Sequence, residues 1–141
     1  MEALIKRLEE WHVKFDVPVG NRITAPEKKQ QILHYNLMRE ELDEFKEACE
    51  KDDIVGIADG LGDVLFVLLS SVVSHGLQGC FREIIEEVCA SNMSKLGEDG
   101  KPIYRADGKL MRGSNYFPPN LSGIIEKHIQ REQIKDQLEG K

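Results

Sequence analysis

The stretch Ile54-Val-Gly-Ile-Ala-Asp-Gly-Leu-Gly-Asp-Val-Leu-Phe-Val-Leu-Leu-Ser-Ser-Val-Val-Ser-His-Gly-Leu77 is the most apolar part of this 141-residue chain. It is long enough to cross a membrane, but it contains Asp59 and Asp63. Each Asp within a span would cost roughly 2.5–3.5 kcal/mol, and no second apolar stretch offers it a partner. We therefore predict the buried central helix of a soluble bundle, capped by Asp52 or Asp53 and ending near His75.

Helical periodicity continues on both sides of this stretch. Apolar residues spaced by four, three and four positions from Leu4 to Phe15 predict a first helix over about 2–14. After a loop over 16–25, Pro26 opens a second helix that runs to about Lys51. A fourth helix is predicted over about 77–95.

The pattern changes after residue 95. Residues 103–105 and 109–111 flank Ala-Asp-Gly at 106–108, which predicts a short β-hairpin. Ser122 is the expected cap of a last, short helix to about Leu138. The predicted fold is all-α: a single domain over 1–141, of the four-helix-bundle type, with a small hairpin-like C-terminal region.

The composition of the chain argues against some classes of binding partner. A formal net charge of −6 makes a nucleic-acid backbone or an anionic membrane a poor partner. The three cysteines are an odd number without Cys-x-x-Cys spacing, and the N-terminus lacks the apolar region of a signal peptide. We expect reduced thiols and a cytoplasmic protein.

The second helix carries carboxylates on two sides. Projection at about 100° per residue places Glu41 between Leu37 and Phe45, on the apolar side. Glu44 lies beside Glu41 one turn later, and Glu40 borders them. A solvated acidic face is the alternative, but a carboxylate that faces a core must be paired, protonated or bound to a cation.

The third helix carries a second acidic pair. Asp59 and Asp63 lie one turn apart, flanked by Gly56 and Gly60, and no Lys or Arg occurs from 54 to 74. Salt bridges to other helices are the structural alternative, although burying such pairs is costly. The glycines suggest that another group approaches this backbone closely.

Together the two helices offer oxygen ligands and no His. This donor set suits Mg²⁺, Mn²⁺ or Ca²⁺ rather than zinc or copper, and the spacing does not match an EF-hand loop. On the fourth helix Asn92 and Lys95 project with the apolar residues, so Lys95 either neutralises the acids or binds a ligand phosphate. Lys109 belongs to a basic patch around the predicted hairpin.

These residues resemble the all-α nucleoside triphosphate pyrophosphohydrolases, the MazG-like and phosphoribosyl-ATP pyrophosphohydrolase-like group. The resemblance covers about residues 37–121. It rests on Glu40-Glu41-Leu-Asp-Glu44, on Asp59-Gly-Leu-Gly-Asp63, and on the later runs Ser-Asn-Met-Ser-Lys-Leu, Asp-Gly-Lys-Pro and Asn-Tyr-Phe-Pro-Pro-Asn-Leu. One departure is Gly60, where the strict second motif has an acid; Asp59 lies on the same face, and we expect it to replace that acid.

The resemblance implies Mg²⁺-dependent cleavage of a nucleoside triphosphate between its α and β phosphates, with Mn²⁺ as a substitute ion. It implies that the catalytic residues are Glu40, Glu41, Glu44 and Asp63, that the metal ligands are Glu41, Glu44, Asp59 and Asp63, and that Asn92, Lys95, Lys109 and Tyr116 bind substrate. A homodimer or dimer of dimers is also implied.

Two other functions remain open at this point. A phosphoribosyl-ATP pyrophosphohydrolase of histidine biosynthesis would share the metal site and differ in the base pocket. A non-catalytic helical dimer that binds divalent metal or nucleotide would keep the carboxylates but release no pyrophosphate. The leading prediction is an enzyme that removes noncanonical or excess nucleotides.

Overall fold

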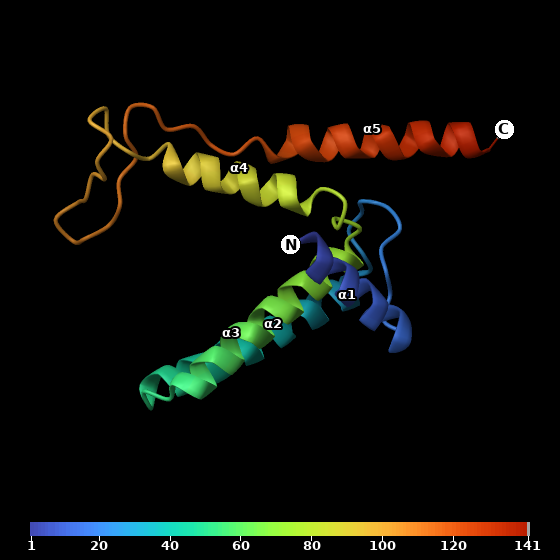
Figure 1. The fold of residues 1–141 in the computed structure, drawn as a ribbon, viewed down its shortest axis with the longest axis horizontal. Coiled ribbons are helices and arrows are strands. Elements are labelled where there is room, and N and C mark those ends of the chain that lie inside the picture. The colour runs from blue at the N-terminus through green and yellow to red at the C-terminus, as the bar shows by residue number, and fades with distance from the viewer. Residues whose placement is uncertain (141) are drawn as a thin grey trace. The chain divides into compact units, whose positions relative to one another are not determined.

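The computed structural model describes residues 1–140 and is built from helices (Figure 1). In chain order these are α1 (Glu2–Lys14), α2 (Lys28–Glu50), α3 (Ile54–Ser74), α4 (Phe81–Met93) and α5 (Leu121–Glu139). The prediction of an all-α fold is confirmed. The chain divides into two compact units, Met1–Gly79 and the part from Cys80 onward. The prediction of a single domain stays a prediction.

The helix ends lie within a few residues of their predicted positions. α1 has the predicted bounds. At the start of α3 the Asp53 carboxylate accepts hydrogen bonds from the N–H groups of Val55 and Gly56, at 3.1 and 3.2 Å. α4 begins four residues later than predicted, because Leu77 still belongs to the end of α3: its N–H donates to the Val72 carbonyl at 3.0 Å.

The loop between α1 and α2 lies against the C-terminal end of α3. The N–H of Gly20 donates to the Val73 carbonyl at 2.9 Å, and the N–H of Thr24 donates to the His75 carbonyl at 3.1 Å. Gly76 ends α3 with φ of +70°, and a Cβ there would lie 2.0 Å from the Arg22 carbonyl oxygen. Glycine is therefore required at the position where this loop crosses the helix end.

A buried histidine ties α1 to this same end of α3. His12 is fully buried, with Nδ1 2.9 Å from the Pro18 carbonyl and Nε2 2.7 Å from Ser70 Oγ. Because a carbonyl only accepts, Nδ1 carries a proton and donates to Pro18, and Nε2 shares a hydrogen bond with the Ser70 hydroxyl. The first unit therefore has its core where α1, the loop and the second half of α3 meet.

The first half of α3 differs from the prediction of a buried central helix. Buried positions concentrate from Val67 to Ser74, whereas Val55 is 76% exposed and Leu61 is 53% exposed. α2 packs along one side of this half, and no other described element of the first unit covers the opposite side. Among residues 1–140, only α3 is long and apolar enough to cross a membrane. This finding considers length and composition alone.

The second unit joins α4 to α5 through one carboxylate. Glu83 accepts from Lys127 Nζ and His128 Nε2, each at 2.9 Å. These two hydrogen bonds lower the pKa of Glu83 to about 2.

Between the helices of this unit, Tyr104 pairs with Leu110 around Gly108, which confirms the predicted hairpin turn as a single bridge. The predicted cap of α5 was wrong. Asn120, not Ser122, caps this helix by accepting from the Gly123 N–H at 3.2 Å, and at 19 residues α5 is longer than the short helix expected.

We predict that Ser70→Ala lowers the free energy of unfolding by about 1–3 kcal/mol, because it leaves Nε2 of the buried His12 without a partner. Ser74→Ala is the matched control. Ser74 is equally buried and bonds Pro18 O at 3.4 Å, but that carbonyl keeps its bond to His12. Urea unfolding of both variants measures the difference, and equal losses would contradict the assignment.

Candidate active site

Five carboxylates of α2 and α3 form what we call the carboxylate cluster. Its members are Glu40, Glu41, Glu44, Asp59 and Asp63. Glu41 is half-buried on the side of α2 that faces α3, and the other four side chains are exposed in the single chain. The expectation that Asp59 and Asp63 lie on a buried stripe is therefore wrong for this chain by itself, because α2 is the only described element of the first unit that packs on their half of α3.

Electrostatics shows that the five residues are neighbours. The pKa of the Glu41 carboxyl is raised, first by desolvation and then by the negative charges of Asp63, Glu44, Glu40 and Asp59. Each of these acids thus disfavours the charged form of Glu41. The structure brings the two acidic pairs together across the α2–α3 contact.

No lysine, arginine or histidine within residues 1–140 forms an ion pair with the carboxylate cluster. None of the five carboxylates takes part in an ion pair or a hydrogen bond there, whereas nearby Glu47 and Glu50 pair with Lys51 and Lys46. The structural alternative, in which salt bridges neutralise the cluster, has no support among the described residues of the first unit. Uncompensated carboxylates of two helices are the chemistry that a hard cation needs.

The carboxylate oxygens of the cluster are the type of donor atom that such a cation binds, but they are not arranged around a common point. Within residues 1–140 no three His, Cys, Asp or Glu side chains lie close enough together to hold a metal ion. Mutual repulsion keeps like-charged side chains apart when nothing neutralises them. The fit to Mg²⁺ therefore rests on oxygen ligation and charge.

A close helix contact sets the spacing of the cluster. A Cβ at Gly60 would lie 3.0 Å from both Cα and Cβ of Phe45 on α2. Position 60 points at the α2 backbone, so a side chain there would require Phe45 to move by a few tenths of an ångström. Gly60 thus permits the close contact, and Asp59 precedes it in the chain.

The exposed side of α2 is hollowed beside the cluster. An open depression of about 490 Å³ is lined by Asn36, Arg39, Glu40, Asp43, Glu44 and Glu47. Arg39 is the one cationic side chain in this lining, at the end nearer Asn36. The depression thus offers an acidic floor next to a single guanidinium.

The other predicted site residues belong to the second unit. Lys95 Nζ donates to Asn92 Oδ1 at 2.6 Å, and Asn92 Nδ2 donates to the Val88 carbonyl at 2.8 Å. The two residues therefore act as a pair at the end of α4. The prediction that Lys95 faces the carboxylates stays a prediction.

Lys109 and Tyr116 lie beyond α4. The Lys109 N–H donates to Asp107 within the hairpin at 3.2 Å, and its side chain is exposed. The Arg112 guanidinium carbon lies 4.4 Å from the centre of the Tyr116 ring, a cation–π contact.

One residue of interest has no motif to mark it. His34 is buried on α2, and its ring Nδ1 has no hydrogen-bond partner among the described residues. It precedes Glu41 by seven residues, two helical turns, so both lie on the same face of α2. That spacing is the signal by which the sequence could have linked His34 to the cluster.

The chain is similar to known proteins. The family model for phosphoribosyl-ATP pyrophosphohydrolase matches residues 8–92, from α1 into α4. A solved structure of a protein from Exiguobacterium sp. 255-15, provisionally assigned as an NTP pyrophosphohydrolase, shares 24% identity with a TM-score of 0.49; the match covers 95% of this chain and 75% of that one. Curated protein sequences give no significant match.

We predict that Glu41→Gln raises or preserves the melting temperature of the metal-free protein. The raised pKa means that the charged form costs stability in the fold, and glutamine removes that charge. Glu47→Gln is the control, because Glu47 pairs with Lys51 at 3.5 Å and lies outside the cluster. Thermal unfolding with a chelator present measures both. A clear fall for Glu41→Gln would make this residue structural.

Proposed function

The chain belongs to the phosphoribosyl-ATP pyrophosphohydrolase family, and from this premise we propose its finer chemistry. We propose that the protein hydrolyses a nucleoside triphosphate to the nucleoside monophosphate and pyrophosphate, with Mg²⁺ as cofactor and Mn²⁺ as its substitute. The role we infer is the removal of noncanonical or excess nucleotides.

The observation that supports the proposal best is the uncompensated carboxylate cluster. Each acid in it raises the pKa of Glu41, and none has a cationic partner in residues 1–140. A folded protein keeps such repulsion when a bound cation relieves it. A triphosphate is itself strongly anionic, so the cluster could bind it through divalent cations and not directly.

In this mechanism Glu41, Glu44, Asp59 and Asp63 would hold Mg²⁺. When bound, Mg²⁺ neutralises the triphosphate and lowers the pKa of the attacking water. Glu40, at the border of the cluster, orients that water and accepts its proton. The bond between the α-phosphorus and the bridging oxygen breaks, and pyrophosphate leaves with the electron pair.

The second unit supplies contacts to the nucleotide in this proposal. Lys95 binds phosphate and Asn92 binds the nucleoside; their mutual hydrogen bond orients both side chains before substrate arrives. Lys109 and Tyr116 are the further substrate-binding residues. The partner implied by the family is a nucleotide.

A second candidate is the reaction that gives the family its description. The match over residues 8–92 favours phosphoribosyl-ATP as an alternative substrate, and the same metal chemistry would serve it. The two functions differ in the base and sugar that are accepted. A non-catalytic metal- or nucleotide-binding dimer is the third candidate, and it would release no pyrophosphate.

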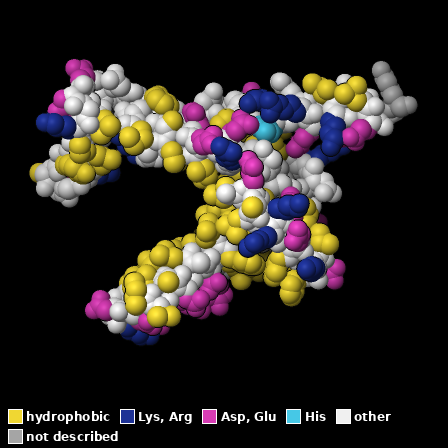
Figure 2. Space-filling view, viewed as in Figure 1, with side chains coloured by type: hydrophobic (Ala, Val, Ile, Leu, Met, Phe, Trp, Pro, Cys, Tyr) yellow, Lys and Arg dark blue, Asp and Glu magenta, His cyan; other side chains and the backbone are white. Residues whose placement is uncertain are grey.

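We further propose that the chain works as a homodimer or dimer of dimers. On the side of α3 away from α2, apolar residues recur at alternating spacings of four and three, the pattern of a helix–helix seam. They are Ile54, Ala58, Leu61, Leu65 and Leu68, all exposed in the single chain. Figure 2 shows hydrophobic side chains along this α2–α3 arm with acidic side chains at its edge. A second copy that covers the seam would also cover the edge of the carboxylate cluster.

We predict that purified protein releases pyrophosphate from at least one member of a panel of nucleoside triphosphates and phosphoribosyl-ATP, and only with a divalent cation present. Asp63→Asn should lower kcat/KM by about a hundredfold or more, as expected when a ligand to the reacting phosphates is lost. Asp59→Asn should match it if Asp59 replaces the acid that Gly60 excludes. Normal Mg²⁺ titration by Asp59→Asn would remove Asp59 from the ligand set.

We predict that Leu61→Glu and Leu65→Glu convert the dimer to monomer, because a buried charge in an apolar seam has no partner. Sedimentation without detergent should give at least twice the 16.0 kDa chain mass for the wild type and the chain mass for the variants. Val13→Glu on α1, also at an exposed apolar position, is the control and should leave the mass unchanged. A wild type that needs detergent to stay in solution would instead favour a membrane as the cover.

A further inference from the structure

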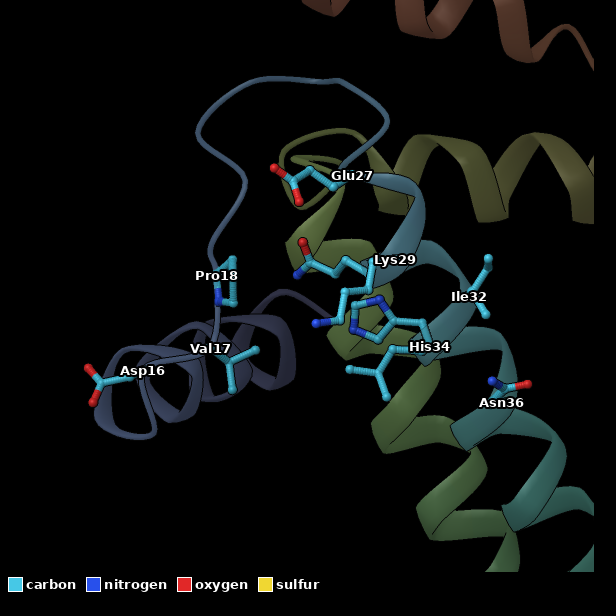
Figure 3. Close-up of a pocket in the computed structure, with 10 residues that line it drawn as sticks. Asp16, Val17, Pro18, Glu27, Lys29, Ile32, His34 and Asn36 are labelled. Carbon is cyan, nitrogen blue, oxygen red and sulfur yellow. The ribbon is translucent and has the colours of Figure 1, made fainter.

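Three of the four histidines of the chain gather in the first unit, and we call them the histidine cluster. His12 lies on α1, His34 lies on α2, and His75 ends α3. The ring centres of His34 and His75 are 6.5 Å apart. Figure 3 shows the His34 side chain pointing from α2 toward the segment of Val17 and Pro18. The cluster therefore joins three helices and the loop between α1 and α2.

His34 is the member of the cluster that is least able to carry a charge. It is 5% exposed, and its Nδ1 atom is buried without a hydrogen-bond partner in residues 1–140. A neutral ring can leave Nδ1 without a proton, whereas an imidazolium has an N–H on both ring nitrogens. Protonation of His34 would therefore create a buried donor that has no acceptor, and such a group is costly.

The other two members differ from His34 because they have acceptors. His12 Nδ1 donates to the Pro18 carbonyl at 2.9 Å, and its Nε2 lies 2.7 Å from Ser70 Oγ. His75 Nδ1 donates to the Ser71 carbonyl at 2.6 Å. A positive charge on either ring would in addition repel a charge on His34.

The charged and titratable groups around His34 come from each neighbouring element. They are His12 of α1, His75 at the end of α3, Asp16 of the loop, and Glu27 and Lys29 at the start of α2. Desolvation lowers the pKa of His34 most, followed by the charges of His75 and His12. Neither Asp16 nor Glu27 forms an ion pair with His34 among the described residues, so no acid offsets this effect.

The loop over residues 16–25 is held in place beside the cluster. The Thr24 N–H donates to the carbonyl of His75 itself at 3.1 Å, and the Gly20 N–H donates to the Val73 carbonyl at 2.9 Å. Between the start of this loop and α2 lies a cavity of about 570 Å³ with mainly apolar walls, which His34 also lines. Because the space is incompletely filled, the loop can separate from α2 there without disrupting a tightly packed core.

We propose that the histidine cluster is an acid-sensitive latch, in which protonation of His34 opens the contact between the loop over residues 16–25 and the first half of α2. At neutral pH the uncharged ring allows the loop to close. When His34 is protonated, the open form gains water for the buried N–H and separates the ring from His75. This role does not depend on the proposed hydrolase activity.

The direction of the pH dependence follows from the lowered pKa of His34. Above its ordinary value of about 6.5 the ring is neutral in both forms, and the closed form has its full stability. As the pH falls below that value, the open form binds a proton that the closed form does not, so closing becomes less favourable. The loss stops once the pH has passed the lower pKa of the closed form. Glu41 has a raised pKa and acts in the opposite direction, so variants of His34 are needed to isolate its contribution.

Amide hydrogen exchange of the full chain, without metal or nucleotide, tests the latch between about pH 7.0 and 5.5. Protection factors, corrected for the intrinsic pH dependence of exchange, are compared for the Gly20 and Thr24 amides and for the Ile57 amide at the other end of α3. The variants are His34→Leu and His34→Gln, which both remove the titrating ring and differ in polarity. His128→Gln is the matched control, because His128 lies in the second unit and bonds to Glu83. The same samples give the NMR titration of the His34 ring.

In the wild type we expect protection of the Gly20 and Thr24 amides to fall by about three- to eightfold over this range, as for one proton taken up on opening. The Ile57 amide should change by less than about twofold, because the opening is local. The pH dependence should disappear in both His34 variants and persist in His128→Gln. The His34 ring should titrate below its ordinary pKa of about 6.5.

Three outcomes would overturn the latch. One is a His34 ring that titrates at or above its ordinary pKa in the folded protein. Another is a pH dependence of loop protection that persists in both His34 variants or disappears in His128→Gln. The third is an equal loss of protection at Ile57, which would mean that acid destabilises the whole unit. Absence of nucleotide hydrolysis would refute the proposed function and leave these measurements unaffected, so the two failures are distinguishable.

Discussion

The contact between α2 and α3 at Gly60 is the constraint on which the candidate site depends. Because position 60 has no side chain, the Phe45 backbone approaches α3 closely, and the acids on either side of the contact become neighbours. A larger residue at position 60 would press on the Phe45 backbone, which would have to move by a few tenths of an ångström. The same closeness concentrates repulsion, so the geometry that assembles the carboxylates also makes them unfavourable without a cation.

Buried and hydrogen-bonded contacts are distributed unevenly over the first unit. Its hydrogen-bonded core, with His12, Ser70 and the loop at the end of α3, lies at one end of the helices. The cluster and the apolar seam occupy the other half of α3, where the single chain buries little. The cation and the second copy that we propose would both bind to that half and would bury surface that the single chain leaves exposed.

Local signals in the sequence predicted the positions of the helices well. They predicted less well which parts of those helices are buried. α1 matches its prediction because its apolar spacing is regular, and α3 begins after Asp53 because that side chain caps it. Asn120 and Ser122 are both good caps, and only the backbone path decides between them. Helical projection placed Glu41 toward α3, but it could not show that the first half of α3 lacks cover. Burial depends on which elements pack together, and the residue pattern of a single helix does not show its packing partners.

His34 was missed for a related reason: a lone histidine on an apolar face is usually a satisfied core residue. What makes it informative is the unpaired Nδ1, which no sequence pattern reveals. The continuous helix α2 fixes the distance from His34 to Glu41 at two turns, so both side chains lie on the stripe of α2 that packs against α3.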